Sequence, residues 1–138
     1  MVMMETQETY LLDTCICIAL IKKNPNVVKH IRLVGVDNCK ISVVTLAELY
    51  FGAYKSGLKK HFDDVEVIKN LFEQYDITDS LSEYGDVRWQ LERTGRKIDH
   101  FDLLIGATAL HEHLVVVTGN TNHFDRIPNL RIENWMEA

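Results

Sequence analysis

Short apolar runs alternate along the chain with segments in which apolar residues have a helical spacing. Runs at 9–13, 40–44 and 114–118 have the length and composition of buried strands, and 130–133 is predicted as the last strand. A helix is predicted over 15–22, ending at Asn24-Pro25. Another is predicted to open at Thr45, with apolar residues Leu46, Leu49, Tyr50 and Ala53 on one face.

Further helical segments follow in the second half of the chain. The first of these helices continues through Tyr75 and is followed by a short segment at 76–78. The second helix ends near Gly95. The segment at 103–110 is apolar on every side, as in a helix covered by its neighbours. The apolar positions that define the first two are Val65, Ile68, Phe72 and Tyr75, and then Tyr84, Val87 and Leu91. Trp135 is expected to pack beyond the last strand.

Apolar strands separated by helices predict parallel pairing, because parallel neighbours need a crossover connection and are buried on both faces. The expected fold is α/β, a three-layer α/β/α sandwich with a central, mostly parallel sheet. In such sheets ligands bind beyond the carboxyl ends of the strands, where the chain order reverses. Functional residues are therefore expected at that edge.

Composition fits a single domain over residues 1–138, with residues 1–8 as a flexible leader. The longest weakly polar run is too short to span a bilayer and the amino-terminal segment lacks a signal-peptide apolar region, so we expect a cytoplasmic protein without membrane contact. Cys15, Cys17 and Cys39 show no disulfide or metal spacing, and the first two are interpreted as small core residues.

The formal net charge of −5 argues against a protein that coats nucleic acid nonspecifically. It leaves room for local cationic surfaces. A solvated helix face is the alternative interpretation of such a cluster. The main cluster consists of Arg88, Arg93, Arg96 and Lys97.

Four polar residues are predicted to meet at the carboxyl edge of the sheet. Asp13 ends the first strand, Glu48 follows the second, Asp102 opens the apolar helix and Asn120 follows the 114–118 strand. Each acid also has a structural explanation as part of a helix start. Asp13 could cap the next helix, and Thr45-x-x-Glu48 and Asp99-x-x-Asp102 have the form of capping boxes.

The convergence of several carboxylates favours a metal site. Two unit charges about 4 Å apart repel by about 4 kcal/mol at an effective dielectric constant of about 20, and no Lys or Arg occupies a matching strand end. Oxygen ligands favour Mg²⁺ or Mn²⁺ over Zn²⁺. A site of this kind suits phosphodiester hydrolysis.

Other phosphate and hydrolase motifs are absent. The chain has no phosphate-binding Gly-x-x-x-x-Gly-Lys-Ser/Thr loop, no Gly-x-Gly-x-x-Gly and no Gly-x-Ser-x-Gly. The chief rival class is a signalling module such as a response-regulator receiver. That class would need an acidic pair near Asp13 and a Lys after the last strand, and neither is present.

The segments that carry these acids resemble the four signature blocks of PIN domains, in particular the VapC toxins of bacterial toxin–antitoxin pairs. The blocks are LLDT, SVVTLAELYFG, DLLIGA and VTGNTNHFDRIP, which begin at residues 11, 42, 102 and 117 and occur in register over nearly the whole chain.

This resemblance implies a Mg²⁺- or Mn²⁺-dependent endoribonuclease with structured RNA such as tRNA as substrate. It also implies a homodimer and a cognate antitoxin that blocks the acidic site. The metal-binding and catalytic acids would be Asp13, Glu48 and Asp102, with Asn120 as a weaker ligand. The basic cluster then becomes a candidate RNA-binding surface. Supporting roles fall to Thr14, Thr118, Asp99 as cap or outer neighbour of the site, and Asp125 acting through water.

Many PIN domains have aspartate where this chain has Asn120, and a carboxamide oxygen can bind Mg²⁺ without supplying charge. The alternative function is therefore a PIN domain with weak or no catalysis that acts as a protein-binding module.

Overall fold

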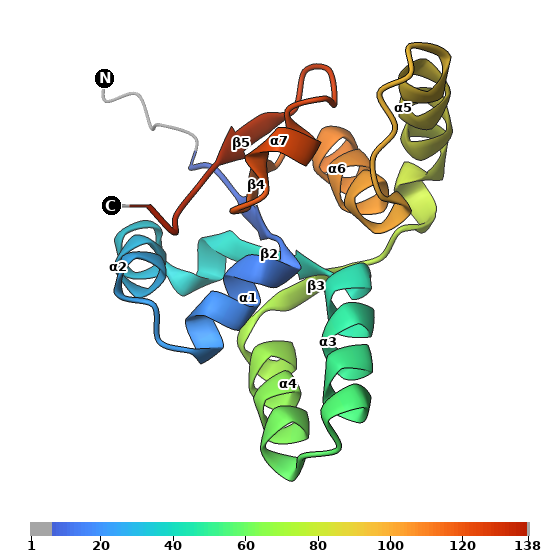
Figure 1. Cartoon of the computed structure of the whole chain (residues 1–138). Helices are drawn as coiled ribbons and strands as arrows, with labels where there is room; N and C mark the ends of the chain where they lie inside the picture. Colours follow the sequence, from blue (N-terminus) through green and yellow to red (C-terminus); the bar gives the residue numbers. More distant parts are fainter. Residues whose placement is uncertain (1–6, 138) are drawn as a thin grey trace, which may run out of the picture.

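The computed structural model describes residues 7–137, and its centre is a parallel sheet with helices on both faces (Figure 1). The order of the five strands is β3-β2-β1-β4-β5, and every neighbouring pair is parallel. The predicted three-layer sandwich is confirmed. Because β1 lies between β2 and β4, the chain order reverses at β1, where a ligand site is expected. The strands are β1 (Tyr10–Leu12), β2 (Cys39–Ser42), β3 (Glu73–Tyr75), β4 (Val115–Val117) and β5 (Arg131–Glu133).

The helices connect the strands and cover both faces of the sheet. Two pairs of helices, α3 with α4 and α5 with α6, lie side by side (Figure 1). No helix among the described residues has the length and apolar character needed to cross a membrane. The α-helices are α1 (Thr14–Ile21), α2 (Pro25–Val34), α3 (Val43–Ser56), α4 (Lys59–Leu71), α5 (Leu81–Arg93), α6 (His100–Glu112) and α7 (Thr121–Phe124), with 3₁₀ turns at Val36–Asn38 and Thr78–Ser80.

The side chains of the central strands alternate between two apolar cores. Leu12 and Val117 pack with residues of α1 to α4 and with Trp135, whereas Leu11 and Val116 pack with residues of α5, α6 and the segment after α7. Successive residues of a strand point to opposite faces, so consecutive leucines supply both cores. The sheet is thereby fixed from both sides, and its carboxyl edge is held in a constant position.

Gly106 allows α6 to approach the chain beyond α7. A Cβ atom built at this position would lie 2.5 Å from the Cδ1 atom of Ile127, which is closer than real Cβ contacts. The close atom is the end of the Ile127 side chain, so glycine at position 106 leaves room for that side chain to pack against α6. Both α6 and the segment that follows β4 contribute residues to the edge of the sheet discussed below.

Two elements differ from the sequence prediction. Tyr75 belongs to β3 rather than to the preceding helix, because α4 ends at Leu71 and Phe72 is already extended, with φ −118° and ψ 135°. β3 is an edge strand with the polar residues Glu73 and Gln74, so it lacks the apolar run that marks buried strands.

The helix α2 was not predicted at all. Asn24-Pro25 does follow the end of α1, but it also begins α2, because the Asn24 side chain accepts hydrogen bonds from the backbone of Asn26 and Val27 and proline occupies the first helical turn. Of the predicted leader over 1–8, residues 1–6 lie outside the described residues.

Candidate functional site

Asp13 follows β1 and is 5% exposed. Its Oδ1 accepts a hydrogen bond of 2.8 Å from the backbone N–H of Thr14, so the side chain caps α1 as the sequence allowed. Its Oδ2 accepts a 2.8 Å bond from the hydroxyl of Thr118, directly after β4. The Asp13 N–H also donates to the carbonyl of Val117. Asp13 is therefore fixed by its own helix and by the neighbouring strand.

Cys15 is partly buried and packs against the core formed with α1 to α4, in agreement with its predicted role, and it also lies beside Asp13. Its Sγ is 3.5 Å from Asp13 Oδ2 and 3.7 Å from Thr118 Oγ1. Burial, followed by the charge of Asp13, raises the pKa of the Cys15 thiol, so the neutral thiol is favoured. Cys17 and Cys39 are buried, in agreement with the prediction for Cys17.

Glu48 reaches the site from the second turn of α3 and is half-buried. Its Oε1 accepts a 2.7 Å hydrogen bond from the hydroxyl of Thr14. The predicted Thr45-x-x-Glu48 capping box is wrong, because α3 begins at Val43 and its N-cap is Ser42. Glu48 therefore has no capping role.

Asp102 lies in the first turn of α6, and its side chain is 13% exposed. Asp99 is the N-cap, as predicted, and accepts a hydrogen bond of 3.3 Å from the backbone N–H of Phe101. Asp102 is thus free of the capping role. Its Oδ2 lies 3.1 Å from the imidazole Nδ1 of His123.

The residue that sequence reasoning missed is His123, in the short helix α7. Its Nδ1 is 2.8 Å from the side-chain nitrogen of Asn120, the exposed residue that precedes α7. The backbone N–H of Asn120 donates to the Thr118 hydroxyl, which joins this segment to Asp13. One feature of the sequence could have indicated His123. It follows Asn120 by three residues, and residues three apart lie on the same side of a helical turn.

The acids influence one another electrostatically. Burial raises the pKa of Glu48, and the charges of Asp13, Asp102 and Asp99 raise it further while the Thr14 hydroxyl lowers it. Burial also raises the pKa of Asp102, against the lowering effect of the His123 hydrogen bond and with a further increase from Asp13 and Asp99. Within residues 7–137, no Lys or Arg forms an ion pair with Asp13, Glu48 or Asp102. Among the described residues, the ion-pair partner of these acids is His123, beside Asp102, and it carries a charge only when protonated.

The donor set fits a hydrated hard cation rather than a closed metal cage. Within the described part of the chain, no three His, Cys, Asp or Glu side chains are close enough to enclose an ion directly. Mg²⁺ commonly binds through one or two carboxylates and keeps several water molecules. Asp13, Glu48 and Asp102 lie close enough to influence one another, because the charge of Asp13 adds to burial in raising the pKa of both Glu48 and Asp102.

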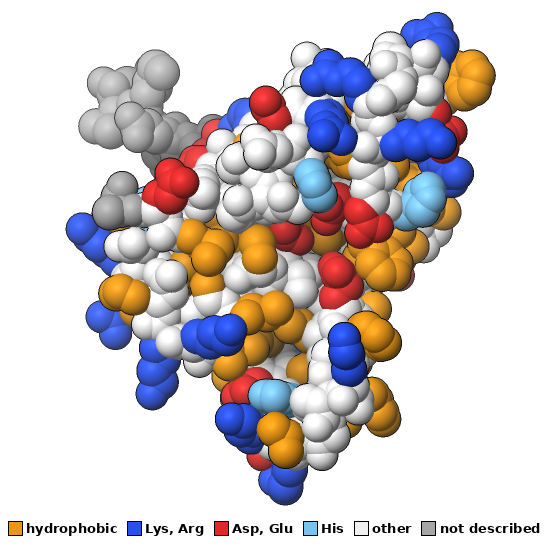
Figure 2. All heavy atoms as spheres, in the orientation of Figure 1, with side chains coloured by type: hydrophobic (Ala, Val, Ile, Leu, Met, Phe, Trp, Pro, Cys, Tyr) orange, Lys and Arg blue, Asp and Glu red, His pale blue; other side chains and the backbone are white. Residues whose placement is uncertain are grey.

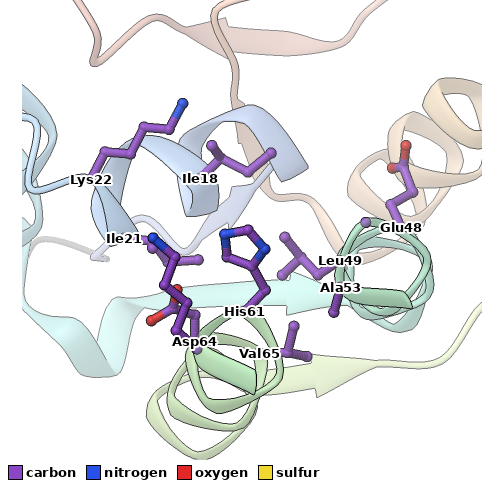
Figure 3. Close-up of a pocket in the computed structure, with 11 residues that line it drawn as sticks. Ile18, Ile21, Lys22, Glu48, Leu49, Ala53, His61, Asp64 and Val65 are labelled. Carbon is purple, nitrogen blue, oxygen red and sulfur yellow. The ribbon is translucent and has the colours of Figure 1, made fainter. Parts of the chain in front are cut away.

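An apolar groove begins beside Glu48 and runs between α1, α3 and α4 (Figure 3). Its volume is about 470 Å³. In Figure 3, Glu48 and Lys22 lie on opposite sides of the view, with Leu49 and His61 between them. The apolar lining consists mainly of Ile18, Ile21, Leu49, Ala53 and Val65, and the charged and polar residues are Lys22, Glu48, Lys60, His61 and Asp64.

The predicted basic residues lie beside α6 but differ in their surroundings. Arg88 donates to the Tyr84 hydroxyl and pairs with Glu92, so its charge is partly compensated. Arg88 and Lys97 line a cavity of about 240 Å³ together with His100 and Leu103 of α6. Arg93 and Arg96 are exposed.

Figure 2 shows acidic side chains gathered in the middle of one face, with Lys and Arg side chains near α5. Asp125, also predicted as a supporting residue, is exposed at the end of α7 and lies outside the hydrogen-bonded group formed by Asp13, Thr118, Asn120 and His123.

The family model described as "PIN domain" matches residues 10–130, which include every residue of this site. The chain belongs to the PIN-domain family. This PIN domain is 35% identical over 130 residues to the tRNA(fMet)-specific endonuclease VapC of Shigella flexneri, covering 91% of the chain and 97% of that relative. It is 37% identical over 132 residues to the ribonuclease VapC2 of Rickettsia felis, with the same coverage of 91% and 97%.

Solved structures agree with the PIN fold. The structure of VapBC2 from Rickettsia felis bound to a DNA fragment from their promoter matches with a TM-score of 0.84 and 36% identity, covering 92% of this chain and 98% of that one. DNA-bound VapBC from Salmonella typhimurium matches with a TM-score of 0.86 and 35% identity, covering 93% and 98%. The resemblance noted in the sequence is thereby confirmed.

Proposed function

We propose that this PIN domain is a metal-dependent endoribonuclease, the toxin of a toxin–antitoxin pair, and that it hydrolyses phosphodiester bonds in RNA. The observation that carries the proposal is the convergence of Asp13, Glu48 and Asp102 at the carboxyl edge of the sheet without a Lys or Arg partner in the described residues. Relatives at 35% and 37% identity are named as a tRNA(fMet)-specific endonuclease and a ribonuclease. Transfer RNA is the first substrate to test.

In the proposed mechanism, Asp13 and Asp102 would hold Mg²⁺ or Mn²⁺, and Glu48 would act beside them from α3. A bound divalent cation lowers the pKa of water and offsets charge that develops on the phosphate. Thr118 and the Thr14 N–H orient the carboxylate of Asp13, and the Thr14 hydroxyl orients that of Glu48. The raised pKa of Glu48 suits a group that accepts a proton from water during attack on the phosphorus.

The proposed RNA contacts are Arg88, Arg93, Arg96 and Lys97. Lys97 and Arg88 line a cavity with the first turns of α6, next to Asp102. Phosphate contacts of this kind would position the RNA without reading its bases, so the shape of the target would decide where it is cut.

Neutralisation is proposed to come from a cognate antitoxin that covers the acidic site. The apolar groove ends at Glu48 and offers such a partner an apolar surface beside the acids. A homodimer is also proposed, supported by apolar side chains of α3 that remain exposed in the single chain, with Phe51 69% and Tyr54 75% exposed. Light scattering of the purified protein tests the homodimer.

The deciding experiment is incubation of antitoxin-free protein with tRNA and total RNA in Mg²⁺, Mn²⁺ or EDTA. Cleavage is expected only with metal, and it should be lost in Asp13→Ala and Asp102→Ala. The matched control is Asp63→Ala, which removes an exposed acid of α4 that pairs only with Lys59 among the described residues. Cleavage that persists in both site variants would identify a contaminant.

The second candidate function is a protein-binding PIN domain without catalysis. Asn120 favours it, because a carboxamide replaces the aspartate of many PIN domains and is exposed beside His123. Metal-independent binding of a partner, together with no cleavage of any RNA in either metal, would support this function over the nuclease.

A further inference from the structure

His123 lies between two of the proposed metal-binding residues and uses one atom for both contacts. Its Nδ1 is 3.1 Å from Asp102 Oδ2 and 2.8 Å from the side-chain nitrogen of Asn120. The side chain of His123 is 42% exposed, so this face of the site is open to solvent ions.

With the Asn120 nitrogen facing the ring, these two contacts are not both hydrogen bonds, because an imidazole nitrogen carries either one proton or one lone pair. A protonated Nδ1 donates to Asp102 Oδ2, and it also donates to Asn120 when the carboxamide is turned with its oxygen toward the ring. An Nδ1 that carries a lone pair faces Asp102 Oδ2 across 3.1 Å, and a cation between them would be bound by both atoms.

The distance also fits shared coordination. Two ligands on adjacent corners of an octahedron with bonds of about 2.1 Å are about 3 Å apart. The 3.1 Å separation of Nδ1 and Oδ2 is compatible with this value, as it is with an N–H···O hydrogen bond. The backbone directs the imidazole to this place, since the N–H of His123 donates to the Asn120 carbonyl and the next residue, Phe124, is 0% exposed in the core.

We propose that His123 is a nitrogen ligand of the divalent cation and that it makes the site favour Mn²⁺ over Mg²⁺. This inference rests on the proposed metal-dependent function. Imidazole is a poor ligand for Mg²⁺, which prefers oxygen, and a better one for first-row transition ions. An acid and amide site without His123 would bind the two ions by oxygen atoms alone.

The first test needs no substitution in the protein. Mn²⁺ is paramagnetic, so a coordinated imidazole nitrogen produces ¹⁴N modulation in pulsed electron paramagnetic resonance spectra of the bound ion. The modulation is expected in the unaltered protein and in His100→Ala, whose imidazole faces the Tyr84 hydroxyl instead. It should disappear in His123→Ala. Bound Mn²⁺ without ¹⁴N modulation in the unaltered protein would overturn the proposal.

The second test is the affinity of both ions, measured by calorimetry for Mn²⁺ and by competition for Mg²⁺. His123→Ala should weaken Mn²⁺ binding by about tenfold and change Mg²⁺ binding by less than about twofold, because only Mn²⁺ gains from the imidazole. An equal loss for both ions would overturn the proposal and leave His123 as a positioning residue that acts through Asp102. Circular dichroism checks that the variant is folded.

Failure of the proposed function is distinguishable from failure of this assignment. RNA cleavage that continues in EDTA, with no binding of either ion, would refute metal dependence and the role of His123 together. Cleavage that requires metal, combined with unchanged ion affinities in His123→Ala, would refute only the role of His123.

Discussion

Asp13 and Asp102 contribute to the same acidic site from opposite sides, but their surroundings differ. Asp13 is 5% exposed and accepts hydrogen bonds from the Thr14 backbone and the Thr118 hydroxyl. Asp102 lies in the first turn of α6 without capping it, and its Oδ2 is 3.1 Å from His123 Nδ1. Asp13 therefore combines a structural role with its proposed chemistry, whereas burial and neighbouring acids raise the pKa of Asp102 and disfavour its charged form.

The largest expected effect is on the free energy of unfolding, which should differ between variants of Asp13 and Asp102. Asp13→Ala should lower the free energy of unfolding by about 2–3 kcal/mol, because it removes a helix cap worth about 1 kcal/mol and the buried acceptor of Thr118. Asp102→Ala should leave this free energy unchanged or raise it. Urea denaturation in EDTA measures both, and equal losses in the two variants would remove the distinction.

The threonine hydroxyls that donate hydrogen bonds to Asp13 and Glu48 allow a second comparison of stability. Thr118→Val should cost about 1–2 kcal/mol, because Thr118 is 0% exposed and its hydroxyl is a donor to the buried Asp13 Oδ2. Thr14→Val should cost less than about 1 kcal/mol, because its partner Glu48 is half-buried and can be hydrated. Thermal denaturation of the pair checks this, and a larger loss in Thr14→Val would contradict it.

The pH dependence of the free energy of unfolding should come from Asp102 and Glu48. Burial raises the pKa of Asp102 and of Glu48, so the folded protein binds these protons more tightly than the unfolded chain. Their contribution to stability is full below the unfolded pKa, near pH 4, and is lost as pH rises through the raised folded pKa.

Asp102→Asn should therefore raise Tm at pH 7 in EDTA by roughly 2–6 °C, which corresponds to about 1 kcal/mol, and the gain should vanish toward pH 4. Asp63→Asn is the matched control, since Asp63 is an exposed acid of α4 whose charge is not among the causes of the raised pKa of Asp102 or Glu48. A gain in Tm that is the same at both pH values would show that charge is not its cause.

The smallest expected effect is on RNA binding by the basic residues Arg93 and Arg96. Arg93→Glu with Arg96→Glu should weaken RNA binding several-fold and flatten the plot of log affinity against log salt by about 0.7 for each phosphate that is no longer neutralised. Lys59→Glu with Lys60→Glu on α4 makes the same charge change away from α6. If the slope of log affinity against log salt is unchanged in the arginine variant, Arg93 and Arg96 form only a solvated helix face.

The sequence was sufficient to predict those site residues whose place follows from the order of strands in a parallel sheet. Buried strands at β1, β2 and β4 have apolar runs, and the rule for parallel sheets then brings Asp13, Glu48 and Asp102 to one edge. β3 escaped prediction because an edge strand can be polar, as Glu73 and Gln74 are. Its place in the sheet depends on pairing with β2, which no local pattern encodes.

The site was predictable as a set of acids but not as a hydrogen-bonded arrangement. Thr14 bonds Glu48 and His123 contacts Asp102 across large sequence separations, so these partners are set by the packing of α1, α3, α6 and α7. Gly106 shows the same limit, because its close approach to Ile127 appears only in three dimensions.

The pairing of β1 with β4 also sets when the site can exist during protein synthesis. Asp13 needs Thr118, which follows it by 105 residues, as a hydrogen-bond donor. At about 5–20 residues per second, a ribosome takes on the order of 5–20 s to cover that interval. Glu48 and Asp102 are added during this interval, and throughout it the growing chain lacks the strand that fixes Asp13. The acidic site is therefore assembled only after β4 has been synthesised and has paired with β1.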